Sequence, residues 1–246
     1  MQIVVNNNII NYEIYNSGNT EKYLLILPGW KRTAAEWDTT TKVFIDKYNV
    51  ITLDFPGFGI SPKPNTDFDI YDYATLVEDF LNKLKISKCT ILGHSFGGRV
   101  AIILAATTSL CDKLILVDSA GFVTNTGLTS NKQILYRCAK TFAKFLPNRL
   151  VIKIRNISGS EDYKNAGELR NTLVKVVNQD LTHLLKDIKA ATLVVWGDKD
   201  SQVGVWRTGI FRREIPNSLI RGVWGSGHSP HLEKPEKFLE VLREFI

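Results

Sequence analysis

The chain has few cysteines and lacks long hydrophobic runs. Its three cysteines, Cys89, Cys111 and Cys138, are widely spaced and form no C-x-x-C pair, and an odd number argues against a disulfide framework. No stretch approaches the roughly 18 unbroken apolar residues of a membrane-spanning helix. The N-terminus has neither the basic segment nor the apolar core of a signal peptide. We therefore expect a cytoplasmic protein with reduced thiols and no integral membrane association.

Basic residues are in excess, but their arrangement is not that of a nucleic-acid-binding protein. The 246-residue chain has a formal net charge of +6. Residues 122–187 account for this excess, because they contain 11 lysines and arginines and only five acidic residues. No basic run is interleaved with aromatic residues. We expect no nucleic-acid partner; the segment either presents solvated helix faces or attracts an anionic substrate or a membrane surface.

Short apolar runs alternate with helical patterns along most of the chain. The expected strands are residues 3–5, 9–15, 23–27, 50–53, 89–92, 113–117, 192–196 and 218–224. The expected helices are residues 33–48, 69–85, the segment after Gly97, and 233–246. This alternation predicts an α/β fold with a mostly parallel eight-stranded sheet flanked by helices.

One mostly helical segment interrupts this alternation. Residues 122–187 have a helical composition that is broken at Pro147 and again at residues 157–160. Strand patterns resume only after this segment. We therefore predict a core formed by residues 1–121 and 188–246, with residues 122–187 as an insertion.

The five residues from Gly93 to Gly97, with the sequence G-H-S-F-G, lie between an expected strand and an expected helix. Although G-x-S-x-G alone also occurs by chance in loops, this context is that of a nucleophile elbow, in which a sharp turn exposes the serine hydroxyl. Glycines at both ends leave room for the close backbone approach. The positive end of the following helix favours a developing oxyanion. Ser95 is therefore a candidate nucleophile.

A serine nucleophile requires a base, and the chain has four histidines. His94 lies beside the serine on the turn and is expected to point elsewhere and pack. His183 falls in the insertion and is expected at the surface, whereas His231 lies near a helix start and is expected to be structural. His228 stands in a glycine-rich loop after the expected strand 218–224, so it is the candidate base.

The acid that orients the base and the amides that bind the oxyanion are also expected near strand ends. Asp198 and Asp200 both follow the expected strand 192–196, and spacing alone does not choose between them. The backbone N–H of Phe96, next to the nucleophile, supplies one oxyanion donor. The N–H of Trp30, after the third expected strand, supplies the second.

These motifs together resemble the α/β-hydrolase fold superfamily, in its single-domain branch with a helical cap. The matching residues are 28–30, 53–61, 93–98, 195–200 and 227–231. Nucleophile, acid and histidine follow the order that such enzymes use. The resemblance implies that Asp200 is the acid, that His228 is the base, and that residues 122–187 form a cap over the pocket.

The resemblance further implies a carboxylesterase-like serine hydrolase. Such an enzyme acts on a small-molecule ester or related acyl substrate through an acyl-enzyme on Ser95, without metal or organic cofactor. We expect Gly29 and Phe122 to line the substrate pocket. Many relatives have His-Gly where this chain has Pro28-Gly29, but the oxyanion donor is a backbone amide and does not depend on that side chain.

Two alternatives remain at this point. The first is a carbon–carbon bond hydrolase or lyase of the same fold, in which relatives often place an arginine in the pocket; Arg99, just after the elbow, is the candidate. Arg99 alternatively faces outward or pairs with an acid. The second is a non-catalytic ligand-binding relative. Serine rather than aspartate at position 95 argues against the related dehalogenases and epoxide hydrolases, whose nucleophile is a carboxylate.

Overall fold

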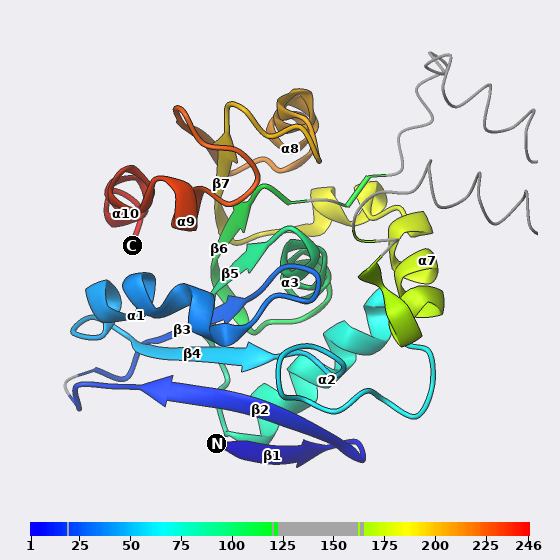
Figure 1. Cartoon of the computed structure of the whole chain (residues 1–246). Helices are drawn as coiled ribbons and strands as arrows, with labels where there is room; N and C mark the ends of the chain where they lie inside the picture. Colours follow the sequence, from blue (N-terminus) through cyan, green and yellow to red (C-terminus); the bar gives the residue numbers. More distant parts are fainter. Residues whose placement is uncertain (19, 120, 123–161, 163–164) are drawn as a thin grey trace, which may run out of the picture.

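A central sheet with helices on both faces forms the body of the molecule (Figure 1). The computed structural model describes residues 1–18, 20–119, 121–122, 162 and 165–246, and the structural statements below concern these residues. The predicted α/β fold with a mostly parallel eight-stranded sheet is confirmed.

The strands follow the order β1-β2-β4-β3-β5-β6-β7-β8 across the sheet. They are β1 (Gln2–Val5), β2 (Asn8–Tyr15), β3 (Tyr23–Leu27), β4 (Asn49–Asp54), β5 (Cys89–His94), β6 (Cys111–Val117), β7 (Ala191–Gly197) and β8 (Ser218–Val223). Strand β2 pairs antiparallel with β1 and β4, and every other neighbouring pair is parallel. The carboxyl ends of β3 to β8 therefore meet at one edge of the sheet, where open α/β sheets place their ligand sites.

The helices cover both faces of the sheet. They are η1 (Ala34–Trp37), α1 (Asp38–Phe44), α2 (Ile70–Lys83), α3 (Phe96–Thr107), η3 (Gly167–Leu169), α7 (Arg170–Asn178), η4 (Thr182–Asp187), η5 (Val205–Arg207), α8 (Thr208–Glu214), α9 (Pro230–Glu233) and α10 (Pro235–Arg243). The helix expected over 33–48 is shorter and divided into η1 and α1, because the backbone at Trp37 departs from helical geometry.

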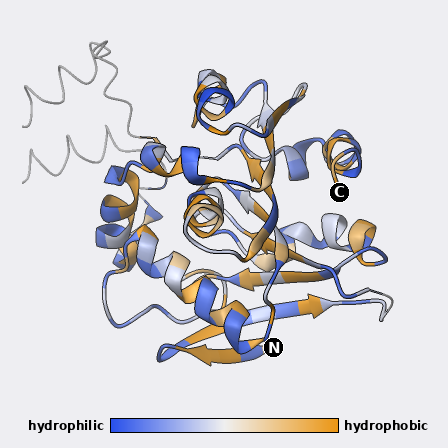
Figure 2. Ribbon diagram, turned by 180° about the vertical axis from the view of Figure 1, so that it is seen from behind, coloured by the Kyte–Doolittle hydropathy of each residue, from blue (hydrophilic) through white to orange (hydrophobic). Residues whose placement is uncertain are grey.

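Alternate residues of the central strands face opposite sides of the sheet, as the two-residue period of a strand requires. Leu25 and Ile51 belong to one buried cluster together with side chains of α2, α3 and α8. Leu24 and Val50 belong to a second cluster together with side chains of α1 and α10. Figure 2 shows the resulting apolar strands between helices whose outer surfaces are polar. Each buried aliphatic side chain contributes about 1.5–3 kcal/mol, so these two clusters stabilise the sheet from both faces.

The predicted insertion falls only partly within the described residues. Helices η3, α7 and η4 belong to it, whereas residues 123–161 and 163–164, together with Cys138, lie outside the described part of the chain. The boundaries 122–187 and the role of a cap therefore remain predictions. Cys89 and Cys111 are both free thiols. Among the described helices, none has the length and apolar character needed to cross a membrane.

Candidate active site

The turn between β5 and α3 holds Ser95 in a backbone conformation that residues with side chains rarely adopt, with φ 48° and ψ −105°. Its N–H donates to the carbonyl of Val117 on β6 at 2.9 Å. A Cβ atom on Gly93 would lie 2.5 Å from the carbonyl oxygen of Gly97, and one on Gly97 would lie 2.1 Å from that of Leu27. Only glycine fits at both positions, so the sequence pattern produces the expected elbow.

Three side chains from the ends of three parallel strands form one hydrogen-bonded row. The hydroxyl of Ser95, after β5, lies 2.9 Å from Nε2 of His228. Nδ1 of the same ring lies 2.9 Å from Oδ2 of Asp200, after β7. With Nδ1 protonated toward the carboxylate, Nε2 is free to accept the serine proton. This arrangement gives a weak nucleophile a base within proton-transfer distance.

Asp200 is buried and ionised. Burial alone would raise the pKa of Asp200, but hydrogen bonding and charge from His228 lower it. The amides of Val203 and Gln202, which donate to Oδ1 at 3.1 and 2.8 Å, act in the same direction. The net effect is a pKa below the ordinary value, so a negative charge faces the imidazole across neutral pH.

Asp198, the other candidate acid in the sequence, contacts a backbone amide instead of the His228 ring. It is exposed, and its Oδ1 accepts a hydrogen bond from the amide of Gly225 in the histidine loop. Of the two aspartates, Asp200 is therefore the one that contacts the His228 ring. Asp198 instead links the loop after β7 to the loop after β8.

Two further contacts hold the histidine loop in place. The carboxylate of Glu233 on α9 accepts from the amides of Gly227 and Ser229, at 2.7 and 3.1 Å. Beneath the loop, Nε2 of His94 lies 2.7 Å from the carbonyl of His228 and acts as the donor there. Glu233 and His94 thus hold the backbone of residues 227–229, which carries the His228 ring.

The other histidines lie where the sequence led us to expect. His94 and His231 are buried, and His231 stacks on Trp37 with ring centroids 4.0 Å apart. Burial, with the nearby Arg32 and His228, lowers the pKa of His231 to about 3. Burial, with the nearby His231 and His228, also lowers the pKa of His94. Both rings are therefore neutral. His183 is exposed on η4.

The two predicted oxyanion donors come from the residue after Ser95 and from a residue that lines the same cavity as Ser95. Phe96 is the first residue of α3, and the first amides of a helix have no partner within it. Trp30 follows β3, and its amide donates to no acceptor among the described residues. The Trp30 and Phe96 rings pack edge to face, with their centroids 5.6 Å apart.

A cavity of about 230 Å³ opens beside Ser95. Its lining consists of Gly29, Trp30, Arg32, His94, Ser95, Asp162, Asn165, Gln202 and His228. Gly29, which the sequence analysis proposed for the substrate pocket, is among these residues. Phe122 is not among the described lining residues and packs instead against Phe211 of α8, with ring centroids 4.8 Å apart.

Arg99 does not face this cavity. It is buried on α3, and its Nη1 donates to the carbonyls of Val176 and Gln179 at 3.1 and 3.0 Å. Burial and the nearby Arg207 lower the pKa of Arg99 to about 10. The guanidinium therefore links the end of α7 to α3. Arg99 faces neither the solvent nor the cavity beside Ser95.

One buried carboxyl near the row was missed from the sequence. Asp118 directly follows β6, and one oxygen of Asp118, one of Asp200 and one ring nitrogen of His228 all lie within 4.8 Å of one another. A signal existed, because an aspartate directly after an apolar parallel strand must lie at the same sheet edge as the other strand ends.

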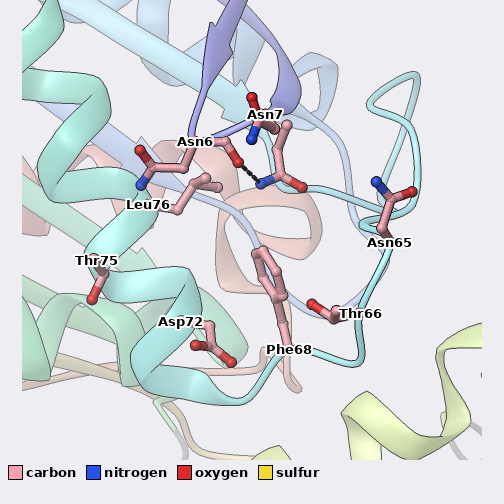
Figure 3. Close-up of a pocket in the computed structure, with 9 residues that line it drawn as sticks. Asn6, Asn7, Asn65, Thr66, Phe68, Asp72, Thr75 and Leu76 are labelled. Carbon is pink, nitrogen blue, oxygen red and sulfur yellow. Dashed lines mark hydrogen bonds between the residues drawn. The ribbon is translucent and has the colours of Figure 1, made fainter.

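A second cavity, of about 310 Å³, lies at the turn between β1 and β2 (Figure 3). It is lined by Asn6, Asn7, Asn8, Asn65, Thr66, Phe68, Asp72, Thr75 and Leu76. This set contains neither a histidine nor a residue of the row. The row of Ser95, His228 and Asp200 therefore does not border this second cavity.

Comparison with known proteins identifies the fold family of the chain. The family model described as alpha/beta hydrolase fold matches residues 22–151, just over half of the chain. The uncharacterized hydrolase YugF of Bacillus subtilis is 24% identical, over 96% of this chain and 94% of its own. Lipase 1 of Psychrobacter immobilis is 28% identical, over 82% of this chain and 69% of its own.

Among solved structures, a membrane phospholipase A described as a bacterial virulence factor superposes with a TM-score of 0.80 at 24% identity. The match covers all of this chain and 84% of the other. At this level of identity, the likeness concerns the fold.

Proposed function

The chain belongs to the α/β hydrolase fold family, and on that premise we propose that it is a serine hydrolase that cleaves a small-molecule ester or related acyl substrate. The observation that carries the proposal is the row from Ser95 through His228 to Asp200, with 2.9 Å at each step. Hydrolase and lipase relatives support the general class.

In the proposed reaction, Oγ of Ser95 bonds to the acyl carbon while Nε2 of His228 takes its proton. The carbonyl π electrons move onto the oxygen, where the amides of Trp30 and Phe96 stabilise the oxyanion. Collapse breaks the bond to the leaving group, which receives the proton from His228. Asp200 keeps the ring in the correct tautomer and stabilises its cationic form.

Water completes the cycle. His228 removes a proton from a water molecule, whose oxygen attacks the acyl carbon of the ester on Ser95. The second oxyanion collapses, the acid product leaves, and the proton returns to the serine oxygen. Each step uses groups of this chain and water alone.

The cavity favours short acyl groups with a polar component. Its volume of about 230 Å³ lies below the roughly 300–1,000 Å³ of drug-sized pockets. Polar side chains of Arg32, Asn165 and Gln202 take part in its lining. Arg99 donates to backbone carbonyls instead of facing the cavity, which favours the ester over the carbon–carbon alternative.

Steady-state hydrolysis of p-nitrophenyl esters of increasing acyl length, with a carbon–carbon diketone substrate in parallel, tests the proposal. We expect turnover that is highest on short esters. Ser95→Ala should reduce kcat by about 10⁶-fold, as loss of a serine nucleophile does in enzymes of this type. Ser201→Ala, at an exposed serine beside Asp200, is the matched control and should retain activity. Full activity in Ser95→Ala would contradict the proposal.

A further inference from the structure

Asp118 has a carboxyl group that is buried and only partly paired. The residue is fully buried at the end of β6, and its own amide donates to the carbonyl of Val195 at 3.0 Å. Oδ1 accepts from the amide of Gly197 at 3.0 Å. Oδ2 is buried and accepts no hydrogen bond from any of the described residues.

The neighbours of Asp118 explain this unpaired oxygen. One oxygen of the Asp118 carboxyl, one of the Asp200 carboxyl and one ring nitrogen of His228 lie within 4.8 Å of one another, and Asp200 contributes to the raised pKa of Asp118. Two ionised carboxylates only accept hydrogen bonds, so they cannot bond to each other. A proton on one of them turns repulsion into a hydrogen bond, as in other closely spaced carboxyl pairs.

The surroundings decide which carboxyl holds the proton. Asp200 receives two amide donors and the His228 ring, all of which stabilise its anion. Asp118 receives one amide. Burial raises the pKa of Asp118 to about 9, and Asp200 and Glu233 add to the rise against the opposing effect of the Gly197 amide.

We propose that Asp118 is a positioning residue that stays protonated and donates a hydrogen bond from Oδ2 to the Asp200 carboxylate, which holds that carboxylate opposite His228. This inference rests on the proposed function for its kinetic consequences. It requires no cofactor, because the proton remains on Asp118 throughout. Asp118 acts through Asp200 and does not touch the reacting atoms.

Charged groups around the pair determine its response to pH. Asp200 lies on the loop after β7, His228 on the loop after β8, Glu233 on α9, and Arg207 near Asp200 on η5. When Asp118 loses its proton, its donor is lost and a second anion faces Asp200. We therefore expect kcat to fall as the pH rises through about 9.

Two substitutions separate positioning from simple support of the fold. Asn at position 118 keeps an acceptor for Gly197 and a donor for Asp200, and asparagine tolerates the local φ of 41°. Asp118→Asn should therefore retain kcat but lose the alkaline fall. Asp118→Ala should lower kcat about tenfold at neutral pH with KM unchanged, as expected for one lost charge-assisted hydrogen bond. Asp112→Asn, at an exposed carboxyl on the same strand, should change neither quantity.

The decisive readout does not depend on turnover. The infrared difference spectrum between the wild type and Asp118→Asn at pH 7 should show the loss of a protonated carboxyl band, and Asp112→Asn should show the loss of an ionised carboxylate. Loss of an ionised carboxylate in Asp118→Asn, or an alkaline fall that persists in that variant, would overturn the inference. Absence of ester turnover in the wild type, with the protonated band present, would instead refute the proposed function and leave the proton on Asp118.

Discussion

Two sets of ionisable side chains meet at the same edge of the sheet and differ in how their polar atoms are hydrogen-bonded. Asp200 and His228 are hydrogen-bonded to each other, and Asp200 accepts two further amide bonds. His94, His231 and Asp118 are buried, and each has at least one polar atom without a partner in the described part of the chain. Burial lowers the pKa of both histidines and raises that of Asp118, so all three groups are neutral, because a charge is costly away from water.

This comparison explains how the site holds one negative charge. Neutral rings at His94 and His231 pack against the histidine loop without competing with His228 for the Asp200 anion. The charge of Asp200 is thus directed at the ring that becomes cationic in the proposed reaction. The following changes test the contrast between the two sets, beginning with the largest effect.

The contrast between the histidines predicts very different outcomes of substitution. His228→Ala should reduce kcat by about 10⁶-fold, because the serine loses its base. His231→Phe should leave kcat nearly unchanged, because neither nitrogen of His231 has a partner among the described residues and a phenyl ring can stack on Trp37. Steady-state kinetics on a short p-nitrophenyl ester measures both. Equal losses of kcat in the two variants would contradict the assignment of His228 as the base and His231 as a structural residue.

The aspartates predict the next largest effect. Asp200→Asn should reduce kcat by about 10⁴-fold, because an amide presents a donor to Nδ1 and stabilises the wrong tautomer. Asp198→Asn keeps an acceptor for the Gly225 amide and should lose little. Measuring kcat for both variants separates the roles, and the reverse order would reassign the acid to Asp198.

The smallest effect concerns stability in acid. The pKa of His231 is about 3 in the folded chain against an ordinary 6.5, so the unfolded chain binds the proton more tightly. The wild type therefore loses stability as the pH falls from about 6.5 toward 3. His231→Phe removes this cost and should be more stable than the wild type by about 2 kcal/mol at pH 5, with no such gain at pH 8. Denaturant unfolding at both pH values measures the free energy of unfolding of the two proteins. An equal difference between them at pH 5 and pH 8 would show that protonation of His231 does not cause it.

The fold and the elbow could be predicted because their signals are local. Strand and helix periodicity indicated the eight strands, and β7 and β8 lie within a residue of their expected ends. The glycines at positions 93 and 97 reflect steric contact inside one turn. A glycine-rich loop also singled out His228, which the structure brings to 2.9 Å from Ser95.

Other features depend on contacts between distant segments and gave no such local signal. Asp198 and Asp200 differ by two positions in one loop, and only the folded loop directs Asp200 at the ring. Arg99 binds carbonyls more than 70 residues away in the chain. The state of Asp118 follows from burial and from Asp200, neither of which a single-strand pattern contains.

The central claim, that Ser95 is an activated nucleophile, is tested most directly by covalent labelling with a fluorophosphonate. We expect the intact mass to rise by one adduct, peptide mapping to assign it to Ser95, and Ser95→Ala and His228→Ala to abolish or greatly slow it. No adduct on the wild-type protein, or an adduct on a different serine, would contradict the account.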